Sequence, residues 1–435
     1  MKRRKAISLF CSAGIGDLGL KANGIETIVA NELLADRCGL FRHNHPETCL
    51  FEGDIWEHAQ AITEEAQRRL HGAELFLAYA TPPCQGMSTN GQGKLQAEVD
   101  AGNRPAEDER NRLIIPAMDV ICALNPRWVL LENVPGMQHT VIRTEVGQER
   151  ILDFISRRLG DGYVGCGEVL ACADYGIPQL RRRLISVFTR DAYGHRYFSR
   201  NGGTFFPREE RSRSHSTLRD AISGLPALDA REGKNSRIDF HPMHWVSVMS
   251  DEKYWWISNT PEGDTAYNNQ CVDPRCGFSA NPGHKETRID GRWKASKAIP
   301  IVCEKCGSLL PRPSMVDKAT GTRRPISGFH SSYRRMEWDK PARALTSNFP
   351  FEASDNKVHP EQNRTLSVYE AMVIQTIADY PYEWISAGKP ASRSLIAHVI
   401  GESVPPRLVD MVARKLVNVS SHKVAVREPA TLFDL

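Results

Sequence analysis

Short runs of apolar residues recur along the first half of the chain, and each run ends at a polar or turn-forming residue. Between the runs lie stretches with helical spacing of apolar residues, most clearly at residues 113–124 and 141–159. Runs that alternate with helices in this way predict an α/β fold with a doubly wound, mainly parallel sheet. The strands are expected at residues 5–10, 27–30, 50–52, 75–80 and 128–131.

The side chains best suited to chemistry follow these runs at their carboxyl ends. Parallel strands bring their carboxyl ends to one edge of a sheet, where open α/β sheets bind ligands. Residues 5–32 run strand, glycine turn, helix and strand, closed by an acid, as nucleotide-binding βαβ units do. The turn does not fit G-x-G-x-x-G, so a plain turn is the alternative. We expect one site at this edge, formed by Phe10, Glu32, Asp54, Cys84 and Glu132.

Cys84 has the most distinctive surroundings of these residues. It follows Thr81-Pro82-Pro83, and two consecutive prolines cannot continue a central strand. The prolines instead fix the backbone in a rigid turn. A thiol held on such a corner is a candidate nucleophile. The alternative is a buried cysteine that serves only as a small apolar residue.

The second half of the chain has a different character. Strand-like runs at 164–172 and 184–188 are followed, from about residue 200, by a stretch rich in Gly, Pro, Ser, Arg and Trp without sustained periodicity. Helical spacing returns at 367–377 and 406–417. We predict a first domain at 1–200, an irregular second domain at 201–335, a return to the first domain at 336–420 and a flexible tail at 421–435.

Composition indicates a globular protein of a reducing compartment. Of the 435 residues 41% are apolar and 25% are charged. No apolar run approaches the roughly 20 residues that span a bilayer, and no signal-peptide cleavage site follows the charged start. Eleven cysteines, an odd number, favour free thiols in a cytosol. Residues 207–335 hold 21 basic against 15 acidic residues, which favours a polyanionic partner, with an ordinary solvated surface as the alternative.

Several longer motifs carry a resemblance to a known family. LFCSAGIGDLGL, TPPCQGMS, LLENVPGM and YGIPQLRRRLISV occur in the order and spacing of the DNA (cytosine-5)-methyltransferases. The match continues in KPARALT at 340–346, RTLSVYE at 364–370 and GESVPP at 401–406. The chain thus resembles the prokaryotic, restriction-modification type of this family. The unmatched middle corresponds to the family's target recognition domain, and the first domain to its S-adenosylmethionine-dependent, Rossmann-like catalytic domain.

The resemblance implies roles for the catalytic residues. Cys84 would add to C6 of cytosine, Glu132 would hold N3 and the 4-amino group, and Arg183, with Arg181, would hold O2. Strand alternation places residues 181 and 183 on one face. The target cytosine must leave the base stack to reach Cys84. The DNA contacts expected from the resemblance and from the basic middle domain are Gln85, Ser88, Gln179, Arg292 and Lys294.

The methyl donor implied by the resemblance is S-adenosyl-L-methionine. Phe10 would contact adenine, Glu32 the ribose and Asp54 the adenine amino group, while the turn of residues 12–16 would wrap the methionine part. In that turn Ser12 and Ile15 stand where glycines are usual in the family. The remaining residues expected at the cofactor are Ala13, Gly14, Gly16, Leu33, Ile55, Pro83, Leu113, Ser403 and Val404.

Four cysteines of the middle domain have the spacing of a structural zinc site. Cys271-x4-Cys276 and Cys303-x2-Cys306 each have glycine after the second cysteine. Four unrelated thiols are the alternative, and His284 is a lesser candidate ligand. A zinc ion would stabilise a segment that has little apolar core of its own.

The sequence therefore predicts a site-specific DNA cytosine C5-methyltransferase with a zinc-containing recognition domain. We expect a cytoplasmic monomer that acts on double-stranded DNA without contacting a membrane; whether a cognate restriction endonuclease exists stays open. A tRNA methyltransferase of the same superfamily is one alternative, and the long basic insert argues against it. A catalytically inactive DNA-binding relative is another, and the intact Cys84, Glu132 and Arg183 argue against that. The recognition sequence is not predicted.

Overall fold

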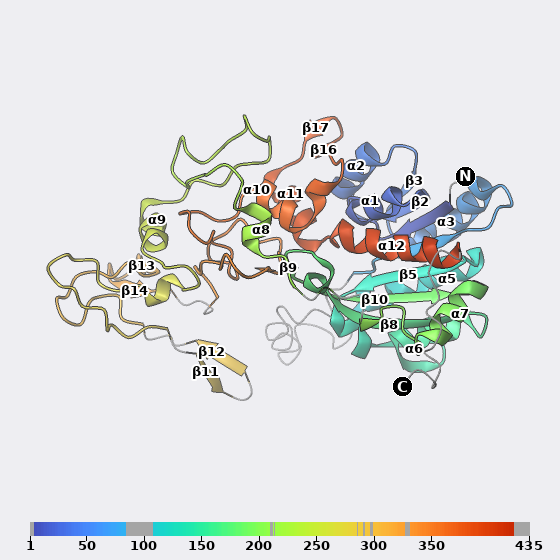
Figure 1. Ribbon diagram of the computed structural model, residues 1–435, viewed down its shortest axis with the longest axis horizontal. Helices are drawn as coiled ribbons and strands as arrows, with labels where there is room; N and C mark the ends of the chain where they lie inside the picture. The colour runs from blue at the N-terminus through green and yellow to red at the C-terminus, as the bar shows by residue number, and fades with distance from the viewer. Residues whose placement is uncertain are drawn as a thin grey trace, which may run out of the picture.

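The computed structural model describes residues 4–83, 108–208, 212, 214–284, 286–289, 292–295, 299–326 and 331–421. Cys84, Gln85 and Ser88 of the predicted site lie outside these residues. Within the described ranges, no helix is both long and apolar enough to cross a membrane. Figure 1 shows two lobes, one built on a sheet flanked by helices and the other consisting mostly of loops.

The larger lobe is organised around a seven-stranded sheet with the order β3-β2-β1-β4-β5-β10-β8. The first five strands in this order are mutually parallel, whereas β10 is antiparallel to β5 and to β8. This mixed, mainly parallel sheet confirms the predicted fold class of the first domain. Its strands are β1 (Arg4–Leu9), β2 (Ile25–Glu32), β3 (Cys49–Glu52), β4 (Leu77–Ala80), β5 (Trp128–Asn133), β8 (Val164–Ala171) and β10 (Arg182–Thr189).

Helices cover both faces of the sheet because successive residues of each strand face opposite sides. Ala78 and Ala80 of β4 lie in one hydrophobic core, and Leu77 and Tyr79 lie in the other. One core includes α3 (Ile55–Leu70), α5 (Ile114–Leu124) and α6 (Ile151–Leu159). The other includes α1 (Ile15–Ala22), α7 (Ala192–Arg200) and α12 (Pro406–Ser420).

The helix α12 brings the end of the described chain back to the first strands. A Cβ atom at Gly19 of α1 would lie 2.5 Å from the carbonyl oxygen of Pro406, so only glycine allows the two helices to pack this closely. The predicted return of residues 406–417 as a helix is therefore confirmed. The helix predicted over 141–159 is only half right. Residues Val141–Thr144 and Gly147–Arg150 form the hairpin β6–β7, since Gly147 turns the chain at φ 114°, and only Ile151–Leu159 is helical.

A third hydrophobic core connects the sheet lobe to the segments after residue 335. It includes α2 (Ala35–Asn44), α8 (Leu218–Ile222), α10 (Val368–Ile374) and α11 (Arg393–Glu402). The short strands β9 (Gln179–Leu180) and β15 (Ala342–Arg343) pair in parallel. Further short elements are η1 (Glu109–Leu113), η2 (Pro135–His139), η3 (Cys172–Tyr175), η6 (Ile377–Asp379), β16 (Ile385–Ser386) and β17 (Lys389–Pro390).

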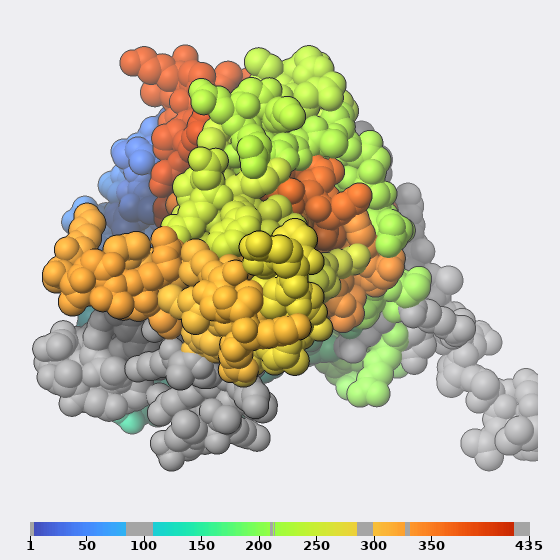
Figure 2. All heavy atoms as spheres, turned by 90° about the vertical axis from the view of Figure 1, so that its left-hand side faces the viewer, coloured from blue at the N-terminus to red at the C-terminus, as the bar shows by residue number. Residues whose placement is uncertain are grey.

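The smaller lobe contains little regular structure, as its composition predicts. Its core combines the aromatic residues Trp256, Tyr267 and Tyr333 with aliphatic residues such as Ile257 and Val358. Figure 2 shows the deep orange atoms of residues about 335–366 beside green and yellow atoms of the preceding segment, in agreement with the hydrogen bond from Ala230 N to Asn363 O. The elements of this lobe are α9 (Asp251–Ser258), η5 (Ala266–Asn268), β11 (Glu286–Ile289), β12 (Arg292–Ala295), β13 (Ser314–Val316) and β14 (Arg323–Pro325).

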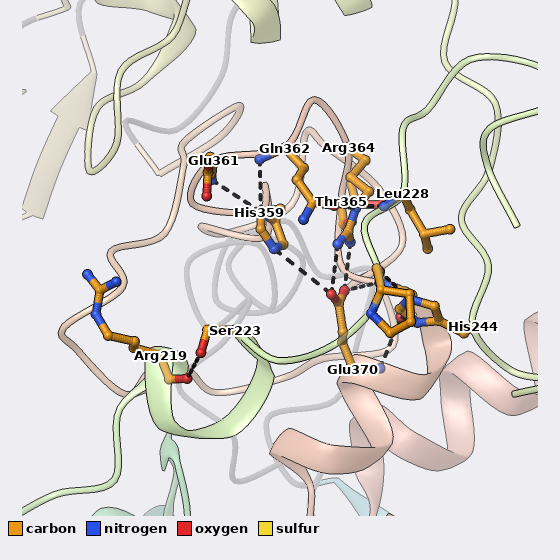
Figure 3. Close-up of polar contacts among 12 residues, drawn as sticks. Arg219, Ser223, Leu228, His244, His359, Glu361, Gln362, Arg364, Thr365 and Glu370 are labelled. Carbon is orange, nitrogen blue, oxygen red and sulfur yellow. Dashed lines mark hydrogen bonds and ion pairs between the residues drawn. The ribbon is translucent and has the colours of Figure 1, made fainter. Parts of the chain in front are cut away.

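Buried charged side chains hold the loops together near the junction of the lobes. Figure 3 shows Arg364 donating to both carboxylate oxygens of Glu370, each over 2.7 Å. Burial would raise the pKa of Glu370, but Arg364 lowers it to about 2. Glu370 also accepts from the backbone N of Ser367, and the two residues form the capping box that begins α10. The motif RTLSVYE is therefore a structural unit that begins this helix.

Candidate active site

Glu132 and Arg183 form an ion pair at the edge where β5 ends. Arg183 Nε lies 2.7 Å from Glu132 Oε1. The register of the antiparallel strands pairs Glu132 with Ile185, so Arg183 approaches from two residues along β10. Burial raises the pKa of Glu132 despite the opposing charges of Arg183 and Arg181. A carboxyl group in this state is suited to donate a proton to a nearby base.

Asn133, the next residue, fixes the corner that leads to Cys84. Its Nδ2 donates to the carbonyl oxygen of Pro82 over 3.0 Å, and its Oδ1 accepts from Val134 N over 2.8 Å. Thr81 Oγ1 donates to the carbonyl oxygen of Phe10 over 2.7 Å. The end of β4 is thus tied to both neighbouring strands before the chain reaches the predicted nucleophile.

The turn after β1 has a backbone that favours glycine. Phe10, Ser12 and Gly14 have φ values of 57°, 50° and 77°. Glu32 holds this turn, because its two oxygens accept from Ser12 N and Leu34 N over 2.9 Å each. A Cβ atom at Gly14 would lie 2.4 Å from His45 Nε2, so a side chain there would displace His45. The turn is therefore fixed by Glu32 on one side and by His45 on the other.

The other predicted cofactor residues differ in their exposure. Leu33 is 59% exposed, whereas Ile15, Ile55 and Val404 are buried in hydrophobic cores. The remaining positions are Asp54, which caps α3 at Trp56 N; Ala13, whose carbonyl accepts from Tyr382; Gly16 in α1; Pro83 after β4; Leu113 at the end of η1; and Ser403, the C-cap of α11.

Two predicted residues of the YGIPQLRRRLISV motif have partners within the protein that the sequence did not indicate. Gln179 was expected to contact DNA, but its side chain is fully buried between Leu345 N and Gln375 Oε1. Arg181 was expected to hold O2 of cytosine, but its guanidinium donates to the carbonyl oxygens of Leu345, Gly401 and Glu402 over 2.9–3.1 Å. Arg181 is therefore a buried link to the end of α11, and Arg183 forms the ion pair with Glu132.

The sequence model of the C-5 cytosine-specific DNA methylases matches residues 4–418. The chain belongs to this family. It is 28% identical over 426 residues to the Type II methyltransferase M1.HgaI of Avibacterium volantium, covering 96% of this chain and 99% of the relative. The Type II methyltransferase M.AgeI of Thalassovita gelatinovora is 25% identical over 449 residues and covers 93% and 97%. The protein is thus a site-specific DNA cytosine C5-methyltransferase of restriction-modification type, and the family implies S-adenosylmethionine as methyl donor.

Solved structures agree with this fold. The crystal structure of a prophage-encoded DNA modification methyltransferase of E. coli aligns with a TM-score of 0.52 at 16% identity, covering 96% of this chain and 99% of that one. A mutant of Spodoptera frugiperda DNMT2 aligns with a TM-score of 0.50 at 13% identity, covering 95% and 99%.

The sequence analysis missed three residues that shape the methyltransferase site. Asn133 is part of the LLENVPGM motif, whose spacing singled out only the acid before it. His45 Nε2 donates to Gly14 O over 3.0 Å, and burial lowers the pKa of His45 to about 4, so its imidazole is neutral near pH 7. Asp17 is buried beneath the turn, where burial raises its pKa to about 6 despite hydrogen bonds from Thr27 and Ser8. No periodic pattern in the sequence distinguishes His45 or Asp17 from surface residues.

The methyltransferase's four middle-domain cysteines converge in space. The sulfur atoms of Cys271, Cys276, Cys303 and Cys306 all lie within 4.8 Å of one another. Sγ of Cys271 lies 3.6 Å from that of Cys306, and Sγ of Cys276 lies 3.8 Å from that of Cys303. The glycines after the second cysteine of each pair, Gly277 and Gly307, adopt φ values of 60° and 74°. His284 does not belong to this cluster among the described residues.

Proposed function

We propose that this methyltransferase acts through a covalent bond between Cys84 and C6 of a flipped-out cytosine. The ion pair of Glu132 and Arg183 carries the proposal, because it lies beside Asn133, which holds the carbonyl of Pro82 only two residues before Cys84. A thiolate at that point attacks C6 and makes C5 an enamine carbon. S-adenosylmethionine supplies the methyl group, which its positive sulfur makes electrophilic.

Glu132 is proposed to neutralise the ring as Cys84 adds. The electron pair pushed from the C5–C6 bond raises the basicity of N3, and protonated Glu132 donates its proton there. The raised pKa of Glu132 favours this donor form. Arg183 is proposed to hold O2 and to orient the carboxyl group. After methyl transfer, loss of the C5 proton to a base restores the C5–C6 double bond and expels the Cys84 thiolate, and N3 returns its proton to Glu132.

The turn after β1 and Glu32 are proposed to bind the donor. The turn of residues 12–16 is proposed to hold the methionine portion, and Glu32, which ends β2, to bind a ribose hydroxyl as the acid of βαβ nucleotide sites does. Phe10 and Leu33 are proposed to contact the adenine ring, and Asp54 its amino group. Asp17 and His45 support the turn without contacting the donor.

The cysteine cluster is proposed to hold a structural zinc ion. Zinc–thiolate bonds are about 2.3 Å long, so sulfur atoms at the corners of a tetrahedron lie about 3.8 Å apart. The two measured Sγ–Sγ distances, 3.6 and 3.8 Å, agree with this spacing. Disulfide bonding would instead need sulfurs about 2.05 Å apart. The donor set of four thiolates is that of a closed structural site, so no chemical step is assigned to the metal.

The recognition domain at 201–335 is proposed to bind duplex DNA and to select the site. Because relatives are named Type II methyltransferases, we also propose that the enzyme protects its site against a cognate endonuclease. It is proposed to act as a monomer. Bisulfite sequencing of DNA from cells expressing the wild type tests the proposal. Methylated cytosines confined to one short sequence, and absent from cells expressing Cys84→Ala, would support it. A Cys84→Ala enzyme that still methylates would exclude the covalent mechanism.

A further inference from the structure

The segment between Pro282 and Pro300 is the most basic insertion of the recognition domain. It contains two acidic residues and five basic ones, namely Lys285, Arg288, Arg292, Lys294 and Lys297. The strands β11 and β12 form an antiparallel hairpin that pairs Glu286 with Ala295 and Ile289 with Arg292. In Figure 1 the hairpin lies at the edge of the smaller lobe. A basic two-stranded ribbon is a form in which proteins enter a groove of DNA.

Prolines stand at both ends of this segment. Proline lacks an N–H group, so neither Pro282 nor Pro300 can donate a backbone hydrogen bond to the other. A single side chain joins them instead. Arg312 Nη1 donates to the carbonyl oxygen of Pro282 over 2.7 Å and to that of Pro300 over 2.9 Å. Its Nε donates to Asn269 O over 2.7 Å, which connects both ends to the aromatic core.

A second set of contacts lies next to Arg312. Asn281 Oδ1 accepts from Glu304 N over 2.9 Å, and Asn281 Nδ2 lies 3.7 Å from Cys303 Sγ. The pair Cys276 and Cys303 also spans the segment, because one cysteine precedes Pro282 and the other follows Pro300. The base of the insertion is therefore closed twice, by Arg312 and by the four-cysteine cluster.

The guanidinium of Arg312 donates hydrogen bonds to backbone carbonyl oxygens. Its side chain is fully buried, and burial lowers its pKa to about 10, still far above neutrality. No carboxylate contacts it among the described residues; carbonyl oxygens accept its hydrogen bonds. A buried cation that is satisfied only by backbone carbonyls fixes the path of those backbones.

We propose that Arg312 is a positioning residue for sequence recognition, which holds the ribbon formed by β11 and β12 in a fixed direction on the recognition domain. The proposal rests on the proposed function, in which this domain selects the site. Arg312 contacts no DNA itself. It acts by joining Pro282 to Pro300, so that the ribbon keeps one orientation when it meets the duplex. The four-cysteine cluster and Arg312 make separate contacts across the base of the insertion, and a substitution can remove either one without removing the other.

The test compares Arg312→Met and Arg312→Lys with Arg275→Met, a control that removes a 93% exposed guanidinium from the same lobe. Each full-length protein is assayed for zinc content, S-adenosylmethionine binding, and affinity for fluorescent duplexes with and without the methylated site. We expect Arg312→Met to keep one zinc and normal donor binding. Its preference for the specific duplex should fall at least about tenfold. Specific DNA-binding proteins bind their sites about 10³–10⁷ times more tightly than other DNA, so this fall is measurable. Arg312→Lys should recover part of that preference.

Hydrogen exchange provides a readout that does not depend on DNA. The amide of Glu304, which donates across the base to Asn281, should exchange faster in Arg312→Met but not in Arg275→Met. Unchanged duplex preference in Arg312→Met would overturn the proposal, as would loss of donor binding, which would make Arg312 a residue of the general fold. Failure of the wild type to methylate any DNA would refute the proposed function instead.

Discussion

Replacing Arg181 by Met separates a structural role from a catalytic one. Its guanidinium satisfies the carbonyl oxygens of Leu345, Gly401 and Glu402, and a methionine leaves all three without a donor in a buried site. A buried polar group left unsatisfied costs about 1–3 kcal/mol. Three such groups cost about 3–9 kcal/mol. The variant no longer buries the charge of Arg181, which offsets part of this cost, so we expect the free energy of unfolding to fall by about 3–5 kcal/mol.

Arg182→Met is the matched control, because Arg182 is the next residue and its side chain is exposed. Urea unfolding of both variants measures the free energy of unfolding, and titration with S-adenosylmethionine confirms a folded site. Arg182→Met should change stability by less than about 0.5 kcal/mol, as surface substitutions do. If Arg181→Met were as stable as its control and lost only turnover, the hydrogen bonds to the end of α11 would contribute nothing to stability. That result would favour a contact between Arg181 and the substrate instead.

Four further outcomes follow from the site. Cys84→Ala should abolish turnover while DNA and donor binding persist, and 5-fluorocytosine in the target should trap the wild type as an adduct on a denaturing gel. Glu132→Gln should lower kcat by a factor of about 10²–10⁴ with little change in donor affinity by calorimetry, and normal turnover of this variant would contradict the assignment. Because the acid form of Glu132 donates the proton, the wild-type kcat should fall as the pH rises through the raised pKa of Glu132. Ser12→Gly should stabilise the fold by up to about 1 kcal/mol in urea, since it relieves a positive φ; a clear loss would mean that the hydroxyl is needed. Replacing Cys303 and Cys306 by Ser should remove about one zinc per chain in elemental analysis and weaken specific DNA binding; specific binding by metal-free protein would exclude a structural metal.

The sequence did not indicate the partners of two predicted site residues, and both cases have the same cause. Strand alternation placed Arg181 and Arg183 on one face, but Arg181 lies between β9 and β10, which belong to different sheets, and its carbonyl oxygen accepts from Cys172 N. The partners of Gln179 and Arg181 lie at Leu345 and Gly401, far away along the chain. A local pattern contains no information about such partners, so the sequence could not tell a buried link from a group that faces the substrate.

The sequence by itself determined the elements whose causes are local. Apolar runs that stop at Phe10, Glu32 and Glu132 specify strands and the edge at which their polar side chains meet, because burial and period act over a few residues. The spacing of the paired cysteines likewise predicts a metal-binding motif without any knowledge of the fold. Only the tertiary structure decided that the pairs converge to within 4.8 Å, that Asn133 holds the corner before Cys84, and that Arg312 joins Pro282 to Pro300. These contacts depend on long-range packing, in which a donor is satisfied by whichever carbonyl the fold brings to it.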